Sequence, residues 1–314
     1  MLGALLIWSH FAAAEAWNGF EVQNALIPLT AIEGGGPPRD GIPTLDHPRF
    51  TEAKNTDWLK ANDRVLGIYR NGIARAYPVA ILNWHEIVND VIGDEPVTVT
   101  YCPLCGSGVA FKSEVDGRRL RFAVSGLLYN SDVLIYDRET ESLWSQILGQ
   151  AVTGKFKGTR LQRIVLTHTH WQDWKKRFPD SSVLSRATGF QRDYSRNPYQ
   201  GYAESRNIWF SVSHQDERLP PKAWVAGVEH EGHFRAYPFD ELAKTPGMVH
   251  EQLGSAEIVV HYDPDNRSVR VTDATGTEIP VIAAYWFAWY AFHPDTEIFR
   301  APAHPSRNEV RDTP

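Results

Sequence analysis

The two cysteines, Cys102 and Cys105, are the residues with the clearest capacity for chemistry. They stand in the run Cys-Pro-Leu-Cys-Gly, directly after a β-branched segment at 97–101. The 314-residue chain has no other cysteine, which excludes a disulfide-stapled scaffold. A disulfide between the two would close a loop of about four residues and contribute only roughly 2 kcal/mol. A purely stabilising role therefore does not account for the pair.

Three kinds of chemistry fit the cysteine pair. A C-P-x-C-G turn after a strand is typical of a zinc knuckle, which needs two further ligands, and His85 and His293 are the leading candidates. The C-x-x-C spacing also fits a redox dithiol, in which a nearby histidine lowers the thiol pKa. In an oxidising compartment the pair could instead form an inert disulfide. Two thiolates with imidazole favour Zn(II) or Cu(I), whereas Mg(II) and Ca(II) prefer oxygen ligands.

The cysteines belong to a sequence that contains an internal duplication. Residues 65–82 read VLGIYRNGIARAYPVAIL and residues 225–242 read VAGVEHEGHFRAYPFDEL, with eight of eighteen positions identical at an offset of 160. The match continues with one inserted residue into VNDVIGDEPVTVTY and VHEQLGSAEIVVHY. Self-similarity of this kind predicts two copies of one structural unit.

Each copy can be interpreted as local structure. Asn71-Gly72 predicts a tight hairpin between two strands, because both residues tolerate positive φ. Pro78 suits the start of a helix and Gly93 its end, which predicts a helix over 78–92 followed by a strand at 97–101. The predicted fold class is therefore α+β and rich in β, with two duplicated strand-hairpin/helix/strand units that share or flank one core.

Differences between the copies indicate where a site would lie. Copy two has Asp263-Pro264-Asp265-Asn266 in place of the cysteine run, and a shorter segment in place of Asn83-Trp84-His85-Glu86. His85 falls at the border of the apolar face of the predicted helix, where a side chain can reach a cleft. Asn130 and Asp132 alternate onto one face of an apolar strand expected over 128–136. A buried carboxylate there would need a partner or a cation, which predicts a cofactor-binding role for both.

The N-terminal residues predict export. An apolar stretch at 2–14 followed by Ala14-Glu15-Ala16 fits a signal peptide that is cleaved after residue 16 and leaves no transmembrane segment in the mature chain. We expect an N-terminal extension at 17–49, repeat unit 1 with the Cys-x-x-Cys site at 50–209, repeat unit 2 at 210–300 and a tail at 301–314. The predicted location is extracytoplasmic, either periplasmic or secreted.

Composition narrows the class of partner. Apolar residues make up 42% of the chain, charged residues 22%, and the net charge is −6 without a basic cluster, so we expect neither nucleic acid nor a nucleotide cofactor. A small molecule or a metal ion remains as the predicted partner. The repeat assigns His230 and His233 to a hairpin, and Trp171 places His168 and His170 before a helix. The non-enzymatic alternative is a binding module with a structural disulfide, whose halves enclose an aromatic groove.

Four strings of this chain together resemble the bacterial domain-of-unknown-function family 3179. They are NWHEIVND, VTYCPLCGS, SGLLYNSDVLIYDRETESLWSQ and AFHPDTEIF, and the resemblance spans about residues 56–299. It implies a protein that is exported or associated with a membrane, and it implies no reaction. By position it singles out His85, Cys102, Cys105, Asn130, Asp132, Asp137, Trp144 and His293.

Overall fold

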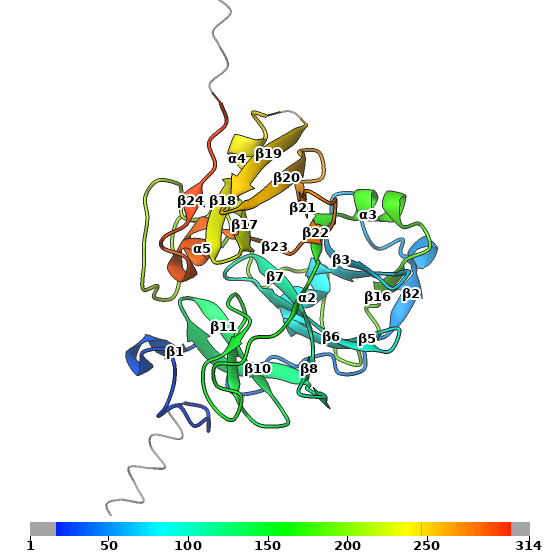
Figure 1. Ribbon diagram of the computed structural model, residues 1–314. Coiled ribbons are helices and arrows are strands. Elements are labelled where there is room, and N and C mark those ends of the chain that lie inside the picture. Colours follow the sequence, from blue (N-terminus) through cyan, green and yellow to red (C-terminus); the bar gives the residue numbers. More distant parts are fainter. Residues whose placement is uncertain (1–16, 246, 303–314) are drawn as a thin grey trace, which may run out of the picture.

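The computed structural model describes residues 17–245 and 247–302, and these residues form a β-rich ring (Figure 1). Strands account for 40% and helices for 11% of the structure, and five sheets form a ring that resembles a five-bladed β-propeller. The prediction of a two-unit α+β fold is therefore wrong. The repeat was visible in the sequence, but the way its strands pair with distant segments was not. The predicted signal peptide and nearly all of the predicted tail lie outside the described residues.

The strands divide among six sheets, named here A to F. Sheet A contains β1 (Ile32–Gly34), β10 (Phe122–Tyr129), β11 (Asp132–Asp137), β12 (Leu143–Ser145) and β13 (Gln150–Ala151). Sheet B contains β14 (Arg163–Ile164), β7 (Ser107–Lys112), β6 (Glu95–Cys102) and β5 (Ile87–Ile92). Sheet C contains β15 (Thr167–His170), β3 (Arg64–Arg70), β4 (Ile73–Pro78), β16 (Ser182–Leu184) and β2 (Phe50–Glu52). Sheet D is the small hairpin of β8 (Glu114–Val115) and β9 (Arg118–Arg119).

The remaining strands follow in the C-terminal part of the chain. Sheet E contains β23 (Val281–Tyr285), β17 (Trp224–His230), β18 (His233–Pro238) and β24 (Glu297–Ile298), and sheet F contains β19 (Met248–Leu253), β20 (Ala256–Asp263), β21 (Ser268–Asp273) and β22 (Glu278–Ile279). The described helices are short: α2 (Val79–His85), α3 (Trp171–Arg177), α4 (Phe239–Leu242), α5 (Trp286–Phe292) and the 3-10 turns η1 (Leu29–Ala31) and η2 (Ala53–Asn55).

The duplicated segments adopt the same structure. The hairpin of β3 and β4 pairs Val65 with Pro78, and that of β17 and β18 pairs Val225 with Pro238, in the same register. The arginine and tyrosine that both copies share make equivalent hydrogen bonds. Arg75 and Tyr77 bond to Asp90 on β5, whereas Arg235 and Tyr237 bond to Glu251 on β19. Asn71-Gly72 and Glu231-Gly232 form the predicted turns, with positive φ at all four residues.

The duplication extends further than the sequence comparison detected. In both copies a third strand pairs with the first strand of the hairpin, and a short helix follows it: β15 and α3 in copy one, β23 and α5 in copy two. Gly67 lies beneath the Trp174 ring and Gly227 beneath the Trp289 ring, so that a Cβ at either glycine would overlap the indole. The chain then returns as a parallel strand beside β4 or β18.

The predicted helix over 78–92 is wrong in its second half. Helix α2 ends at His85, and Glu86 adopts φ 57°, which lies outside the helical region. The β-branched residues Ile87, Val88 and Val91 then form strand β5, which pairs with β6. The same kind of error affects 128–136, because Asn130 and Ser131 have φ 53° and 65° and turn the chain between β10 and β11.

The largest apolar core lies where sheets A, B and E meet helix α5. It contains Cys102, Cys105, Trp144, Trp286 and Trp289 among its buried members.

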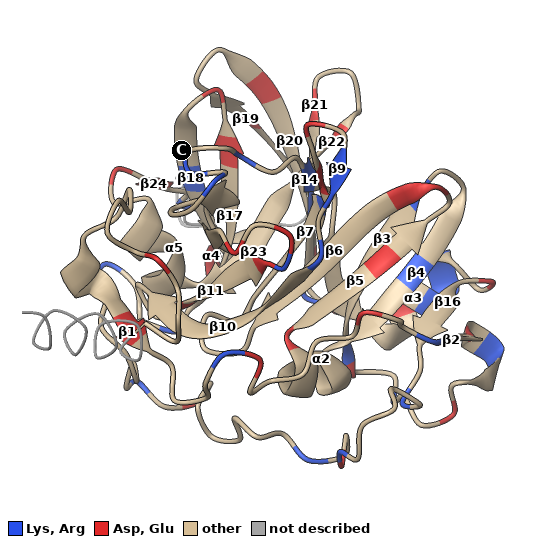
Figure 2. Ribbon diagram, turned by 90° about the horizontal axis from the view of Figure 1, so that it is seen from below, with Lys and Arg blue, Asp and Glu red and all other residues tan. Residues whose placement is uncertain are grey.

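Lys and Arg are interspersed with Asp and Glu over the ribbon (Figure 2), as expected from the scattered charges of the sequence. Within the described ranges, no helix combines the length and apolar character that crossing a bilayer requires.

Candidate metal centre

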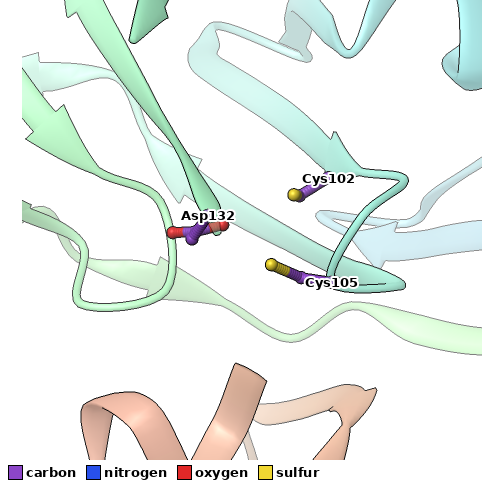
Figure 3. Close-up of side chains that lie close together, drawn as sticks. All are labelled: Cys102, Cys105 and Asp132. Carbon is purple, nitrogen blue, oxygen red and sulfur yellow. The ribbon is translucent and has the colours of Figure 1, made fainter. Parts of the chain in front are cut away.

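The cysteine turn lies next to the start of strand β11. The Sγ atoms of Cys102 and Cys105 and a carboxylate oxygen of Asp132 all lie within 4.8 Å of one another, and all three side chains are buried. Figure 3 shows the two sulfurs and the carboxylate converging from β6, the turn after it and β11. The turn between β10 and β11 creates this approach, because it places Asp132 directly after Ser131, whose carbonyl oxygen lies 3.4 Å from Cys105 Sγ.

Only one of the two carboxylate oxygens of Asp132 accepts a hydrogen bond from the described protein. Its Oδ2 accepts a hydrogen bond of 3.0 Å from the Ile147 backbone N–H, whereas Oδ1 is buried and has no hydrogen-bond partner among the described residues. Burial raises the pKa of Asp132 to about 7, because the charged form loses its hydration. The S–H groups of Cys102 and Cys105 beside this carboxylate are weak donors, so its ionised form is poorly satisfied, and a cation is one way to satisfy it.

The thiols also lie in surroundings that disfavour their charged form. Burial raises the pKa of Cys102 and raises that of Cys105 well above its ordinary value, with a further contribution from the nearby Asp132 carboxylate. The structure contains both as free cysteines. Without a cation, the two sulfurs are therefore protonated at neutral pH and are poor nucleophiles.

A second buried carboxylate, Glu86, extends the polar cluster. Its side chain is 6% exposed, and its Oε1 accepts a hydrogen bond of 3.2 Å from the Tyr199 hydroxyl. Burial raises the pKa of Glu86 to about 7, and the charge of Asp132 adds to the shift. Tyr202 belongs to the same buried cluster as the two cysteines; burial raises the pKa of its hydroxyl, which lacks a partner among the described residues. Sequence reasoning placed Glu86 inside a helix over 78–92 and missed both tyrosines.

The structure does not bring His85 to the cysteines. Its Nδ1 lies 2.7 Å from the Pro43 carbonyl oxygen and its Nε2 lies 2.7 Å from the Tyr194 hydroxyl. Both ring nitrogens are therefore occupied, and the ring packs against Phe190 and Tyr194. His85 and Glu86 both lie in the segment that differs between the copies, and of the two it is Glu86 that lies near enough to act on the Cys102 thiol.

His293 also lies outside the group, for a reason that the duplication explains. It follows helix α5 as Phe178 follows α3, and each ring packs on the preceding tryptophan, with centroids 4.2 Å apart for His293 and Trp289 and 4.5 Å for Phe178 and Trp174. Burial lowers the pKa of His293 to about 4, so the ring is neutral. Its position is therefore that of an aromatic packing residue.

Asn130 has a positioning role in the hairpin beside the site. Its Nδ2 donates to the Ala291 carbonyl oxygen at 3.2 Å, and its Oδ1 accepts from the Ser213 backbone N–H at 2.7 Å. The first bond holds the turn between β10 and β11 against the end of α5, and the second connects it to the segment before β17. Of the residues predicted to form the site, the structure thus unites Cys102, Cys105 and Asp132.

The fold and the site together define a β-rich ring protein with a buried dithiol–carboxylate group between its sheets. The chain matches the family described as protein of unknown function DUF3179 over residues 39–296, which is most of its length. It therefore belongs to that family, as its motifs indicated. Neither a curated protein nor a solved structure matches the chain.

Proposed function

We propose that the protein binds a transition-metal ion, Zn(II) before Cu(I), through Cys102, Cys105 and Asp132. The observation that carries the proposal is the convergence of three buried ligand atoms within 4.8 Å of one another, one of them on the Asp132 carboxylate, whose Oδ1 has no hydrogen-bond partner in the described structure. Around a tetrahedral zinc ion with Zn–S of about 2.3 Å, ligand atoms lie roughly 3.5–3.8 Å apart. Small side-chain movements would bring the three atoms to that spacing.

The buried acidic groups at the site favour the binding of a divalent cation. Asp132 and Glu86 are both buried, and no lysine, arginine or histidine forms an ion pair with either among residues 17–245 and 247–302. Two ionised carboxylates and two thiolates would be strongly unfavourable there without a compensating charge. A carboxylate beside two thiolates favours Zn(II), because Cu(I) prefers purely soft ligands. Glu86 or a water molecule held by it would complete the fourth position.

The competing proposal is a thiol–disulfide or other redox catalyst that uses the same cysteines. Such a catalyst needs a thiol that ionises easily and that its partner can reach. Here burial raises the pKa of both thiols, and the exposed fraction is 2% for Cys102 and 0% for Cys105. These observations favour the metal-binding proposal over the redox proposal.

Metal content decides between these proposals. The full chain is purified anaerobically, its free thiols are counted and its metals are measured, and the metal-free protein is then titrated with Zn(II). We expect one zinc ion per chain, lost in the double variant Cys102→Ser, Cys105→Ser and weakened at least tenfold in Asp132→Asn. His85→Asn is the matched control and should retain zinc. A metal-free protein with a reversibly formed disulfide would support the redox proposal, and a permanently unreactive disulfide would support a structural role.

Export remains part of the proposal. The support is the apolar stretch at 2–14 and the Ala-x-Ala pattern after it. N-terminal sequencing of the protein from the extracytoplasmic fraction should give a chain that begins at residue 17. A chain recovered with its first residues intact from the cytoplasm would contradict this expectation.

A further inference from the structure

A second site lies between the two copies, on the other side of the cysteine turn. A cavity of about 320 Å³ is lined by residues of both copies, among them Arg64, His168, His170, Trp224, Tyr285 and Arg267. The lining contains no aspartate or glutamate. This concave site therefore combines aromatic surface with a few charged and polar groups, the composition that lets a pocket orient a small ligand.

The duplication shows that the lining of this cavity has diverged. Arg64 pairs with His170 across β3 and β15, and at the equivalent place in copy two Trp224 pairs with Tyr285 across β17 and β23. In the same way His168 corresponds to Ala283. At these paired positions copy one thus contributes charged and polar groups and copy two contributes an apolar wall, while Arg267, between β20 and β21, adds a second positive charge from copy two.

His168 requires a hydrogen-bond donor that the protein does not supply. Its exposed fraction is 6%, and its Nε2 lies 3.1 Å from the Gly108 carbonyl oxygen, which can only accept. Burial lowers the pKa of His168 to about 3, so the ring is neutral and carries its single proton on Nε2. Nδ1 is therefore an acceptor, and it is buried without a partner among the described residues.

The two arginines of the lining supply the positive charge. The Arg64 guanidinium lies over the Trp224 ring, 4.3 Å from its centroid, and Arg267 lies 6.0 Å from the centroid of the Phe239 ring. Stacking on an aromatic ring orients a guanidinium and leaves its N–H groups free to bind a carboxylate or phosphate. Neither arginine forms an ion pair within the described part of the chain.

We propose that this cavity binds a small hydroxylated acid: an anion held by Arg64 and Arg267 that also donates a hydroxyl hydrogen to His168 Nδ1. A 2-hydroxycarboxylate has both features, and so does hydrogen phosphate. The apolar wall formed by Trp224 and Tyr285 would face the carbon skeleton of an organic acid. The proposal is independent of metal binding, because none of these residues belongs to the dithiol–carboxylate group.

The test compares ligands that differ by one hydroxyl group. The metal-free full chain is titrated by calorimetry with lactate, with propionate, which lacks the hydroxyl, and with inorganic phosphate. We expect lactate to bind at least tenfold more tightly than propionate. Arg64→Met should weaken lactate binding at least tenfold, whereas the control Arg118→Met, on the exposed strand β9, should leave it unchanged. His168→Phe should remove the preference for lactate over propionate.

Each outcome either supports or contradicts the binding of a hydroxylated anion in this cavity. Tighter binding of phosphate than of lactate, with the same dependence on Arg64, would identify hydrogen phosphate as the hydroxylated anion that the cavity binds. Equal binding of lactate and propionate would overturn the proposal, as would binding that Arg64→Met and Arg118→Met affect alike, or no binding of any of the three. Because His168→Phe also removes the bond to Gly108, its folding is checked by circular dichroism. If it does not fold, the ligand comparison and the two arginine variants still give the answer.

Discussion

Replacing Asp132 with asparagine should make the metal-free protein more stable at pH 8, although the side chain is fully buried. In the unfolded chain this carboxyl has its ordinary pKa of 3.8 and is ionised above that pH. In the folded protein burial keeps it protonated up to about pH 7. The stability that this group contributes is therefore present below about pH 4 and is lost as the pH rises to about 7. A difference of roughly 3 pKa units corresponds to about 4 kcal/mol, at about 1.4 kcal/mol per unit.

An asparagine avoids this loss because it has no charge to bury. Its Oδ1 can still accept from the Ile147 N–H, and its Nδ2 takes the place of the unpartnered oxygen. We expect the free energies of unfolding of Asp132→Asn and of the parent to be similar at pH 4. At pH 8, in the presence of a chelator, the variant should be more stable by up to about 4 kcal/mol. Glu86 remains in both proteins and leaves a shared decrease between pH 4.5 and about 7.

Urea denaturation at several pH values measures these differences. Added Zn(II) should narrow the difference at pH 8, because an ion at a hundred times its Kd stabilises the parent by about 2.7 kcal/mol, whereas a variant that binds tenfold more weakly gains only about 1.4 kcal/mol. Asp137→Asn is the matched control at the other end of β11. Asp137 accepts bonds from the Thr140 N–H and Trp144 Nε1–H, so its replacement should destabilise the protein at both pH values. A destabilised Asp132→Asn at pH 8, with the pH dependence of the parent, would refute the reasoning.

Because burial raises the pKa of both thiols, Zn(II) binding at pH 7 should release at least two protons, which calorimetry in buffers of different ionisation enthalpy measures. His85→Asn should lower the free energy of unfolding by about 1–3 kcal/mol through its two ring bonds, without loss of zinc. His293→Phe should fold with unchanged or higher stability in thermal melting, since the equivalent position of copy one has phenylalanine. Gly227→Ala should lower stability by about 1–3 kcal/mol because its Cβ would overlap the Trp289 ring, whereas Gly34→Ala, with open space around it, should have little effect.

Local features were predictable where a few neighbouring residues decide them. The turn at Asn71-Gly72 formed as expected, because both residues adopt positive φ at little cost. The helix after Pro78 began as predicted, and its end was missed because Glu86 adopts a conformation that its residue type rarely takes. The β-branched residues Ile87, Val88 and Val91 were the local signal of a strand there, and the pairing of β5 with β6 establishes it.

The arrangement of the sheets depends on distant pairings that the sequence pattern does not specify. Strand β16 lies parallel to β4, and β24 lies parallel to β18, each after a long intervening segment. The proximity of Asp132 to the cysteines arises in the same way. In copy one, residues 113–166 separate β7 from β15 and carry most of sheet A, whereas copy two has only residues 274–280 between β21 and β23. The carboxylate of the site thus belongs to an insertion, which the comparison of the two copies could not align.

The contact between the cysteine turn and sheet E has a consequence for cooperativity. The Tyr285 backbone N–H donates to the Cys105 carbonyl oxygen at 2.8 Å, and Gly106 leaves no room for a Cβ beside the Trp224 ring. Copy two, which has no ligand of the proposed metal centre, therefore forms one wall of it. Unfolding of sheet E would release the turn and with it the ion. Metal loss and the melting of the C-terminal half should thus coincide in a single transition. Release of the ion would then indicate that the C-terminal half has unfolded, although that half contains no metal ligand.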